Sequence, residues 1–346
     1  MRRWKNWSNV IAKALRVLSG LEALPDPGRA AGCAATVGVF DGVHLGHFVV
    51  LRKVVERARA LGAQPVMVTF TGHPKELLLG HAPPTVTSLE HRLLLFERAG
   101  IATTLVLEFT PELRTLTAEQ FVRRVLLDGL GLRELVFGFD SKFGRDRGGN
   151  PSSLAPLAQA LGFTITEVAP LRLRGRAVSS TAVREAVSLG DLQAAALMLG
   201  RPVSVLGTVV RGDGRGRGLG FPTANLDLHH EVHPPEGVYA ALARWEEALR
   251  PAVVNIGRRP TFAGTQRQVE VHLLDCQADL YGRDLEVFFL EKLREEQAFP
   301  DRAALTAQIT ADAAQAAVIA AAAPRVWRIP GRFLPIEGVT PAELSS

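Results

Sequence analysis

The sequence predicts an α/β domain, in which helices cover both faces of a parallel sheet, followed by an antiparallel β-barrel with a C-terminal helix. From about residue 34 to about residue 200, short apolar runs alternate with helical stretches, a spacing typical of βαβ units. Closely spaced extended segments then follow, with no long helix before about residue 301, as in an antiparallel barrel. The length of 346 residues suits two domains of this kind.

The first domain is predicted to contain five buried strands, each separated from the next by a helix. Gly62 and Gly100 end two of the helices, and Thr117 with Gln120 forms a capping box at the start of another. The predicted strands are 34–40, 65–70, 103–109, 135–139 and 163–168, and the predicted helices are 48–61, 88–99, 117–127 and 153–161.

The pattern changes near Pro202, after two short helices that start at Thr181 and Asp191. The barrel strands are predicted at 203–211, 237–245, 252–256, 268–274 and 285–290, before an Ala-rich helix from Asp301. We therefore predict an N-terminal extension at 1–16, the first domain at 17–186, a linker helix at 187–202, the barrel at 203–323 and a C-terminal tail at 324–346.

The composition favours small phosphate-bearing partners over nucleic acid or membrane. The net charge is +5 and the pI about 9.6, but the basic residues are spread along the chain with only two Tyr and four Trp. No apolar run is long enough to span a bilayer. Cys33 and Cys276 belong to no CxxC pattern, so neither a disulfide framework nor a thiolate metal site is expected. We expect a cytoplasmic monomer or weak homo-oligomer.

The segment 38–47, which reads GVFDGVHLGH, follows a predicted strand and opens a helix. A helix N-terminus at the carboxyl end of a parallel strand is a site for a phosphate group, and glycines allow close approach. Two histidines three residues apart can share one face there and stabilise developing charge. The competing interpretation is a tight turn with two surface histidines. The candidate residues are Gly38, Phe40, Asp41, Gly42, His44, Gly46 and His47.

Two further segments of the first domain carry phosphate-binding chemistry. Hydroxyl groups stand where the helix near Thr181 begins, and Arg184 follows one turn later, so that Ser179, Ser180, Thr181 and Arg184 form a candidate phosphate clamp. The segment 137–145 follows another strand and offers Asp140 to a ribose or flavin group. Its basic residues Lys142 and Arg145 fit a phosphate contact or a solvated loop equally well.

In the barrel, a strand runs into a glycine-rich loop at 207–225 that lacks the Walker pattern. Such a loop can wrap a polyphosphate with backbone N–H groups, and hard oxygen ligands beside it suit Mg²⁺. A flexible hairpin loop is the competing interpretation. The candidate nucleotide-binding residues are Gly212, Gly214, Arg215, Gly216, Gly218, Gly220 and Pro222, and the candidate metal ligands are Thr223 and Asn225.

The strand at 268–274 alternates, so that Val269, Val271 and Leu273 share one face while Glu270 and His272 share the other. A carboxylate that faces a cavity is a good general base for a primary alcohol. Without a cavity, Glu270 would be a solvated acid on the outer face of the strand.

The HxGH element of His44 and His47 and the SSTxxR element that ends at Arg184 resemble the nucleotidyltransferase superfamily. Together with the segment 137–145 and the PTAN sequence of Pro222 to Asn225, they make the chain similar to the bacterial bifunctional riboflavin kinase/FAD synthetases over about residues 17–314. The resemblance implies a Rossmann-like FMN adenylyltransferase domain followed by a riboflavin kinase barrel.

By this resemblance, the barrel phosphorylates riboflavin to FMN with ATP, and the first domain adenylylates FMN to FAD with release of pyrophosphate. Glu270 takes the proton from the riboflavin 5′-hydroxyl, and Mg²⁺ accompanies ATP. His44 and His47 stabilise charge in the second step. FMN and FAD are substrate and product rather than redox cofactors, and the predicted flavin contacts are Asp140, Asn255 and Arg294.

The chain departs from the family pattern in the first domain. Val39 stands where Asn is usual, Gly72 where the first Pro of Pro-His-Pro is usual, and Ser141 where a second aromatic is usual. These differences motivate a second hypothesis, in which only the kinase is active. A third hypothesis is a nucleotidyltransferase with a different substrate, and a fourth is a flavin- or RNA-binding protein without catalysis.

Overall fold

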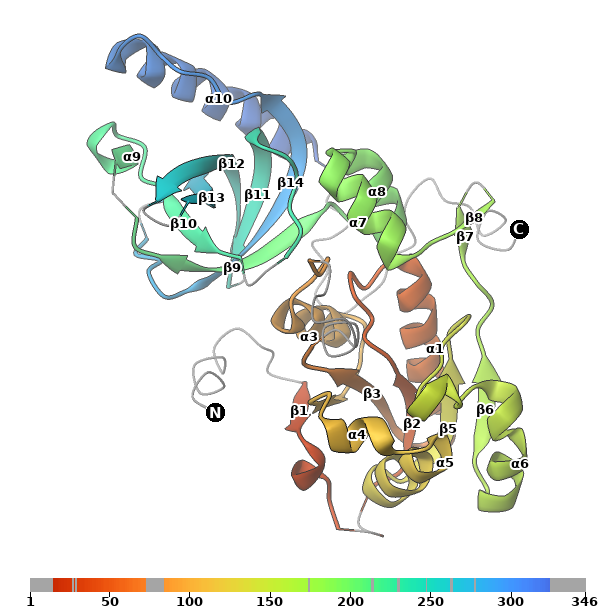
Figure 1. Cartoon of the computed structure of the whole chain (residues 1–346). Coiled ribbons are helices and arrows are strands. Elements are labelled where there is room, and N and C mark those ends of the chain that lie inside the picture. Colours follow the sequence, from red (N-terminus) through yellow and green to blue (C-terminus); the bar gives the residue numbers. More distant parts are fainter. Residues whose placement is uncertain are drawn as a thin grey trace. The chain divides into compact units, whose positions relative to one another are not determined.

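The computed structural model describes residues 15–26, 28, 30–72, 84–173, 175–212, 215–228, 231–246, 248–261, 264–276 and 278–323 (Figure 1). Most of the predicted extension, the tail at 324–346, His73, Pro74 and Gly214 lie outside the described residues. The described chain divides into two compact units. The sheet unit holds the described residues up to 72 together with 89–180, and the barrel unit holds 84–88 with 181–323. The division falls between Ser180 and Thr181.

The sheet unit contains the predicted parallel sheet. Its six strands follow the order β1-β4-β3-β2-β5-β6, and every neighbouring pair is parallel. The strands are β1 (Arg16–Ser19), β2 (Cys33–Val37), β3 (Gln64–Phe70), β4 (Thr103–Leu107), β5 (Leu132–Phe137) and β6 (Thr164–Glu167). The sequence did not predict β1, because four residues at an edge, only one of them buried, carry no alternation of their own.

Helices cover both faces of this sheet, as predicted, because successive strand residues point to opposite sides. Met67 packs into one core with α1 (Leu45–Leu61) and α3 (Leu89–Arg98). Its neighbours Val66 and Val68 pack into a second core on the other face. That core also takes side chains from α4 (Pro111–Thr115), α5 (Ala118–Phe121), the π-helix Val122–Gly129 and α6 (Pro151–Leu161).

Several predicted element ends need correction: the strands predicted at 34–40 and 103–109 end at Val37 and Leu107, and two further differences are larger. The helix predicted at 117–127 begins with the expected capping box of Thr117 and Gln120, but after one turn it widens into the π-helix. The strand predicted to reach Phe139 ends at Phe137, because the chain turns there and Asp140 takes a φ of 57°.

The barrel unit confirms the antiparallel barrel. Six strands close in the order β10-β13-β12-β11-β14-β9. They are β9 (Ser204–Val210), β10 (Ala224–Asp227), β11 (Gly237–Trp245), β12 (Ala248–Thr261), β13 (Gly264–Leu273) and β14 (Asp284–Arg294). The sequence missed β10, whose four residues directly follow the glycine-rich loop.

Apolar side chains fill the barrel interior, so a polar ligand site of this unit has to lie on the outside of the barrel. Helices α7 (Ser180–Leu189) and α8 (Leu192–Leu199) contribute to this core. The C-terminal helix α10 (Arg302–Ala322), capped by Asp301, instead packs on the outer barrel face, where Ala316 meets Val238 and Val253. Figure 1 shows α10 lying along the outside of β11, β12 and β14.

A short segment from the first half of the chain belongs to the barrel unit, which the sequence did not indicate. The backbone N–H of Ser88 donates to the buried Glu231 carboxylate at 2.7 Å, and Leu206 N–H donates to the other carboxylate oxygen at 3.0 Å. Thr85 forms a parallel bridge with Glu231. The pairing of residues so distant in sequence had no local signal.

In the part of the chain that the structure describes, every helix is too short or too polar to cross a bilayer.

Candidate functional site

In the sheet unit, the winding of the chain reverses between β2 and β5, which are neighbours in the sheet. Ligands of open α/β sheets bind outside the carboxyl ends of the strands at such a point. The segment 38–47 follows β2 and the segment 137–145 follows β5, so the fold brings two separate predicted motifs to one place.

The two histidines meet at the start of α1. His44 is the N-cap residue, and its Nδ1 accepts a hydrogen bond from the backbone N–H of His47 at 3.3 Å. Their rings stack with centroids 3.6 Å apart, and Phe40 stacks on His47 at 4.5 Å. Because Nδ1 of His44 accepts, a neutral His44 carries its proton on Nε2.

The loop before α1 is held in a strained shape. Phe40 and Val43 have φ values of 53° and 37°, and Gly42 has a φ of 79°. A non-glycine residue with its backbone in the left-handed region is strained, and the strain is greatest for a β-branched residue such as Val43. Residues strained in this way concentrate at functional sites. Ser180, from the second predicted motif, donates its hydroxyl to the Asp41 carbonyl at 2.9 Å. The strain supports a functional role for this loop.

Arg92 of α3, which was not among the residues predicted from the sequence, fixes the start of the same loop. Its guanidinium is buried and donates to the carbonyl groups of Val39 at 2.6 Å and Phe70 at 3.1 Å. The signal in the sequence was an arginine inside an otherwise apolar helix face. Val39 makes this contact through its backbone, so the departure from Asn leaves the contact in place.

The segment after β5 is more exposed than the histidine loop. Lys142 lies 3.0 Å from the Asp140 carboxylate, and its hydrogen bond and charge lower the pKa of Asp140. Both side chains remain open to solvent. Phe139 beside them is 65% exposed, which presents an aromatic ring at this edge of the sheet.

The second predicted motif divides between the units. Ser179 and Ser180 belong to the sheet unit, whereas Thr181 and Arg184 belong to the barrel unit. Arg184 donates from Nε to the carbonyl of Pro84 at 2.8 Å. Its predicted phosphate contact therefore stays a prediction.

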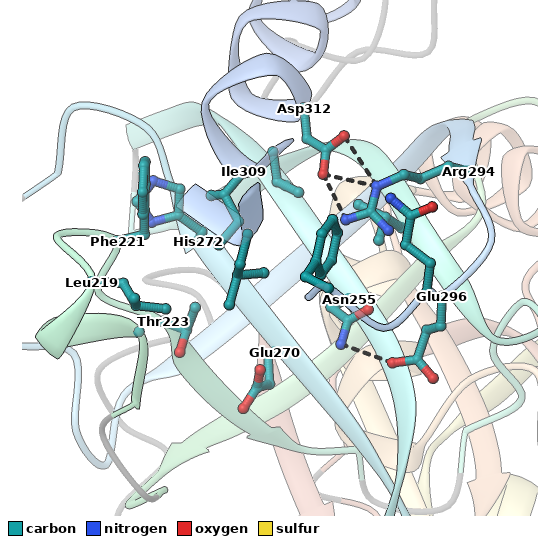
Figure 2. Close-up of a pocket in the computed structure, with 16 residues that line it drawn as sticks. Leu219, Phe221, Thr223, Asn255, Glu270, His272, Arg294, Glu296, Ile309 and Asp312 are labelled. Carbon is teal, nitrogen blue, oxygen red and sulfur yellow. Dashed lines mark hydrogen bonds and ion pairs between the residues drawn. The ribbon is translucent and has the colours of Figure 1, made fainter. Parts of the chain in front are cut away.

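The barrel unit carries a cavity of about 490 Å³ on its outer face, between the strands, α10 and the glycine-rich loop. Figure 2 shows Glu270 and Thr223 at one end and Arg294 with Asp312 at the other. The lining residues are Gly216, Leu219, Phe221, Thr223, Val238, Val253, Asn255, Glu270, His272, Arg294, Glu296, Gln297, Phe299, Leu305, Ile309 and Asp312.

The predicted alternation of β13 explains why Glu270 reaches this cavity. Val269, Val271 and Leu273 point into the barrel core, while Glu270 and His272 point outward. Because α10 and the loop cover this face, the carboxylate lines a cavity rather than an open surface.

A small polar network surrounds the carboxylate. Asn225 of β10 pairs directly with Glu270 of β13. Gln268 donates from one amide nitrogen to the Asn225 side-chain oxygen and, at 3.2 Å, to Glu270 Oε1. Gln268 was not among the predicted residues. It could have been predicted, because it lies two positions before Glu270 on the same face of β13.

The glycine-rich loop contains one helical turn, α9 (Arg215–Gly218), where the sequence analysis predicted a wrapping loop. A Cβ added at Gly216 would lie 2.3 Å from the Phe221 carbonyl oxygen, and one added at Gly212 would lie 2.0 Å from the Asn225 amide nitrogen. Close approach of the backbone requires a glycine at position 216, whereas at Gly212 the contact is with the end of the Asn225 side chain, which can move. Gly218 and Gly220 face open space, and the side chain of Arg215 lies outside the described residues.

We expect Gly216→Ala to slow the barrel's reaction, because the new methyl group displaces the backbone next to Thr223. Misplacement of a site by about 1 Å can cost about 100-fold in rate. Gly218→Ala adds the same methyl group to the same helical turn with nothing within 4 Å, so a comparison of the two variants isolates the effect of the clash at position 216. Steady-state rates of both variants check this prediction, and equal rates would contradict it.

The two predicted flavin contacts of the barrel already have partners. Asn255 donates from Nδ2 to Glu296 at 3.2 Å. Arg294 forms a two-pronged ion pair with the buried Asp312 of α10, with its closest contact at 2.8 Å (Figure 2). Arg294 thus ties α10 to the end of β14, a partnership that no sequence signal indicated.

These two units define a class: a two-domain enzyme that transfers phosphate-containing groups from nucleotides. The matching family models agree, since residues 26–182 match FAD synthetase and residues 199–320 match riboflavin kinase.

Relatives named bifunctional riboflavin kinase/FMN adenylyltransferase cover most of the chain. The Pseudomonas fluorescens protein is 41% identical over 89% of this chain and 98% of its own length. The Escherichia coli K12 protein is 39% identical over 87% of this chain and 95% of its own length. The chain therefore belongs to the bifunctional riboflavin kinase/FMN adenylyltransferase family.

A solved structure of the same architecture carries a different name. A crystal structure described as a macrolide-efflux protein from Streptococcus pneumoniae is 28% identical, with a TM-score of 0.72. The match covers 86% of this chain and 97% of that one, so both domains of the fold are shared.

Proposed function

We propose that this chain makes FAD from riboflavin in two ATP-dependent steps, with one site in each unit and the residue roles given below. The barrel phosphorylates riboflavin to FMN, and the sheet unit adenylylates FMN with release of pyrophosphate. The observation that carries the assignment of roles is Glu270, a carboxylate that lines a cavity directly opposite Asn225. The pairing of β13 with β10 places the candidate general base beside the candidate metal ligand Asn225.

In the kinase step, Glu270 takes the proton from the 5′-hydroxyl of riboflavin. The hydroxyl oxygen then forms a bond to the γ-phosphorus of ATP, and the bond from that phosphorus to ADP breaks. Transfer of this kind depends on positioning and charge neutralisation more than on covalent catalysis. The apolar part of the cavity, with Leu305 and Ile309 of α10, suits the flavin ring.

Mg²⁺ fits the donors at this end of the barrel unit, where Thr223 lines the cavity and Asn225 pairs with the cavity residue Glu270. Thr223 offers a hydroxyl oxygen and Asn225 an amide oxygen, both of the hard type that Mg²⁺ takes. The described residues contain no group of three or more His, Cys, Asp or Glu side chains suited to a metal. Thr223 and Asn225 would hold this ion beside the nucleotide. When bound, the ion neutralises charge on the phosphates.

In the adenylyltransferase step, an oxygen of the FMN phosphate attacks the α-phosphorus of ATP, and pyrophosphate leaves. His44 and His47 donate hydrogen bonds to the charge that develops there. Gly46 keeps this face open, since a Cβ would approach the His44 ring to 3.2 Å. Ser180 of the sheet unit holds the pyrophosphate, and Asp140 contacts the flavin nucleotide.

A time course with purified protein, riboflavin and Mg–ATP tests both halves. FMN should appear first and FAD later, and FMN supplied alone with Mg–ATP should yield FAD and pyrophosphate. A reaction that stops at FMN would leave only the kinase. The strained loop and the Val39 carbonyl contact to Arg92 favour two active sites.

We place the enzyme in the cytoplasm, where ATP is available, as a monomer or weak homo-oligomer without nucleic-acid or membrane partners. Both cysteines are free, which suits a reducing compartment. Cell fractionation and light scattering of the purified protein test these assignments.

A further inference from the structure

His272 lines the barrel cavity and has no part in the transfer described above. Its Nδ1 lies 2.8 Å from the carbonyl oxygen of Pro222, and its ring meets Phe221 edge-on with centroids 5.5 Å apart. A carbonyl oxygen only accepts hydrogen bonds, so Nδ1 of His272 carries the proton. The imidazole therefore donates a hydrogen bond to the backbone of the residue directly before Thr223.

The turn at Phe221 and Pro222 joins α9 to β10 and lies outside any strand. Two hydrogen bonds anchor it: Phe221 N–H donates to the Gly216 carbonyl at 2.9 Å, and His272 donates to Pro222. Thr223 follows immediately, so its hydroxyl is placed by this turn on one side and by β10 on the other.

His272 and Glu270 extend from the same outer face of β13 into the cavity. One rigid strand therefore carries the general base and also the group that holds the turn before Thr223. A shift of the turn would change the position of the Thr223 hydroxyl relative to the Glu270 carboxylate. The distance between base and nucleotide site depends on this link.

We propose that His272 is a positioning residue of the kinase site, whose Nδ1–H fixes the Pro222 carbonyl and so places Thr223 relative to Glu270. The inference rests on the proposed kinase function. His272 acts through the turn and transfers no proton to or from the substrate.

Kinetics of His272→Leu and His272→Asn test this role. Leu removes the donor, and we expect kcat/KM for Mg–ATP in FMN formation to fall about 100-fold, as for a displaced site, with the KM for riboflavin little changed. Asn keeps an N–H near the position of Nδ1 and should recover most of that loss. Conversion of supplied FMN to FAD, in the other unit of the same chain, should stay unchanged.

A double variant separates positioning from general damage. If His272 acts through Thr223, then Thr223→Ala combined with His272→Leu should be no slower than Thr223→Ala alone, because residues that act as a unit are not additive. Full additivity would overturn the proposal. So would a His272→Leu enzyme with wild-type kinase rates, or a His272→Asn enzyme as slow as the Leu variant.

The same assay distinguishes failure of the positioning role of His272 from failure of the proposed kinase function. Wild-type protein that makes no FMN from riboflavin would reject the kinase assignment and the role of His272 together. If the wild-type enzyme makes FMN and the His272 variants make it at the same rate, only the positioning role is rejected. Thermal denaturation of each variant shows whether it is folded, and a loss of both activities with a lowered Tm would also count against the proposal.

Discussion

Glu270→Ala abolishes FMN formation from riboflavin while FAD formation from supplied FMN continues: this is the largest effect that we expect. The carboxylate faces the cavity, opposite Asn225, and is the only general base assigned to the kinase step. Loss of a positioned general base typically costs about 100- to 10,000-fold in rate. Separate assays with riboflavin or with FMN as the first substrate check this prediction.

Two further variants sharpen the test at Glu270. Glu270→Gln keeps the shape of the side chain and its capacity to bond with Gln268 but cannot accept a proton, so it should be nearly as slow as the Ala variant. Glu291→Ala removes an exposed carboxylate from β14 and should leave both steps intact. Kinase activity of Glu270→Gln close to that of the wild type would exclude proton transfer by this residue.

His47→Ala should produce the opposite pattern, with FAD formation lost and FMN formation retained. The backbone N–H of His47 still donates to His44 Nδ1 in this variant, so the helix cap survives while the imidazole is removed. Removal of a donor that stabilises developing charge costs about 100- to 1,000-fold in kcat. The rate of pyrophosphate release from ATP and FMN is the measurement.

His44 needs a different substitution, because it caps α1 and is also proposed to act through its ring. His44→Asn keeps a good N-cap residue and removes the imidazole, so a large loss of FAD formation without loss of stability would assign chemistry to the ring. His44→Ala should lose activity and also about 1 kcal/mol of helix stability. If His44→Asn and His47→Ala impair both steps equally, the assignment of two separate sites is wrong.

Much of the fold could be predicted from local pattern. The alternation of β13 correctly separated Glu270 and His272 from the apolar residues of the barrel core. The capping box at Thr117 and the start of the Ala-rich helix near Asp301 were also visible in the sequence. These features depend on residues a few positions apart, and their physical causes are therefore local.

The missed features depend on residues far apart in the chain. Arg92 reaches Val39 across 53 positions, Asp312 binds Arg294 from another element, and Ser88 donates to Glu231 across 143 positions. No periodicity links such pairs. The short edge strand β1 and the four-residue strand β10 were missed for a related reason, since only their neighbours make them strands.

The sequence by itself determined the family and the order of the two domain folds and supplied the candidate site residues, because motifs and periodicities are local properties of the chain. Only the tertiary structure decided that the barrel is filled and that its cavity lies on the outside, closed by α10. It also decided that Arg294 is bound to Asp312 and that His272 holds the turn before Thr223. Those facts arise from packing between distant segments, where the free energy of burial and hydrogen bonding selects partners that no short stretch of sequence specifies.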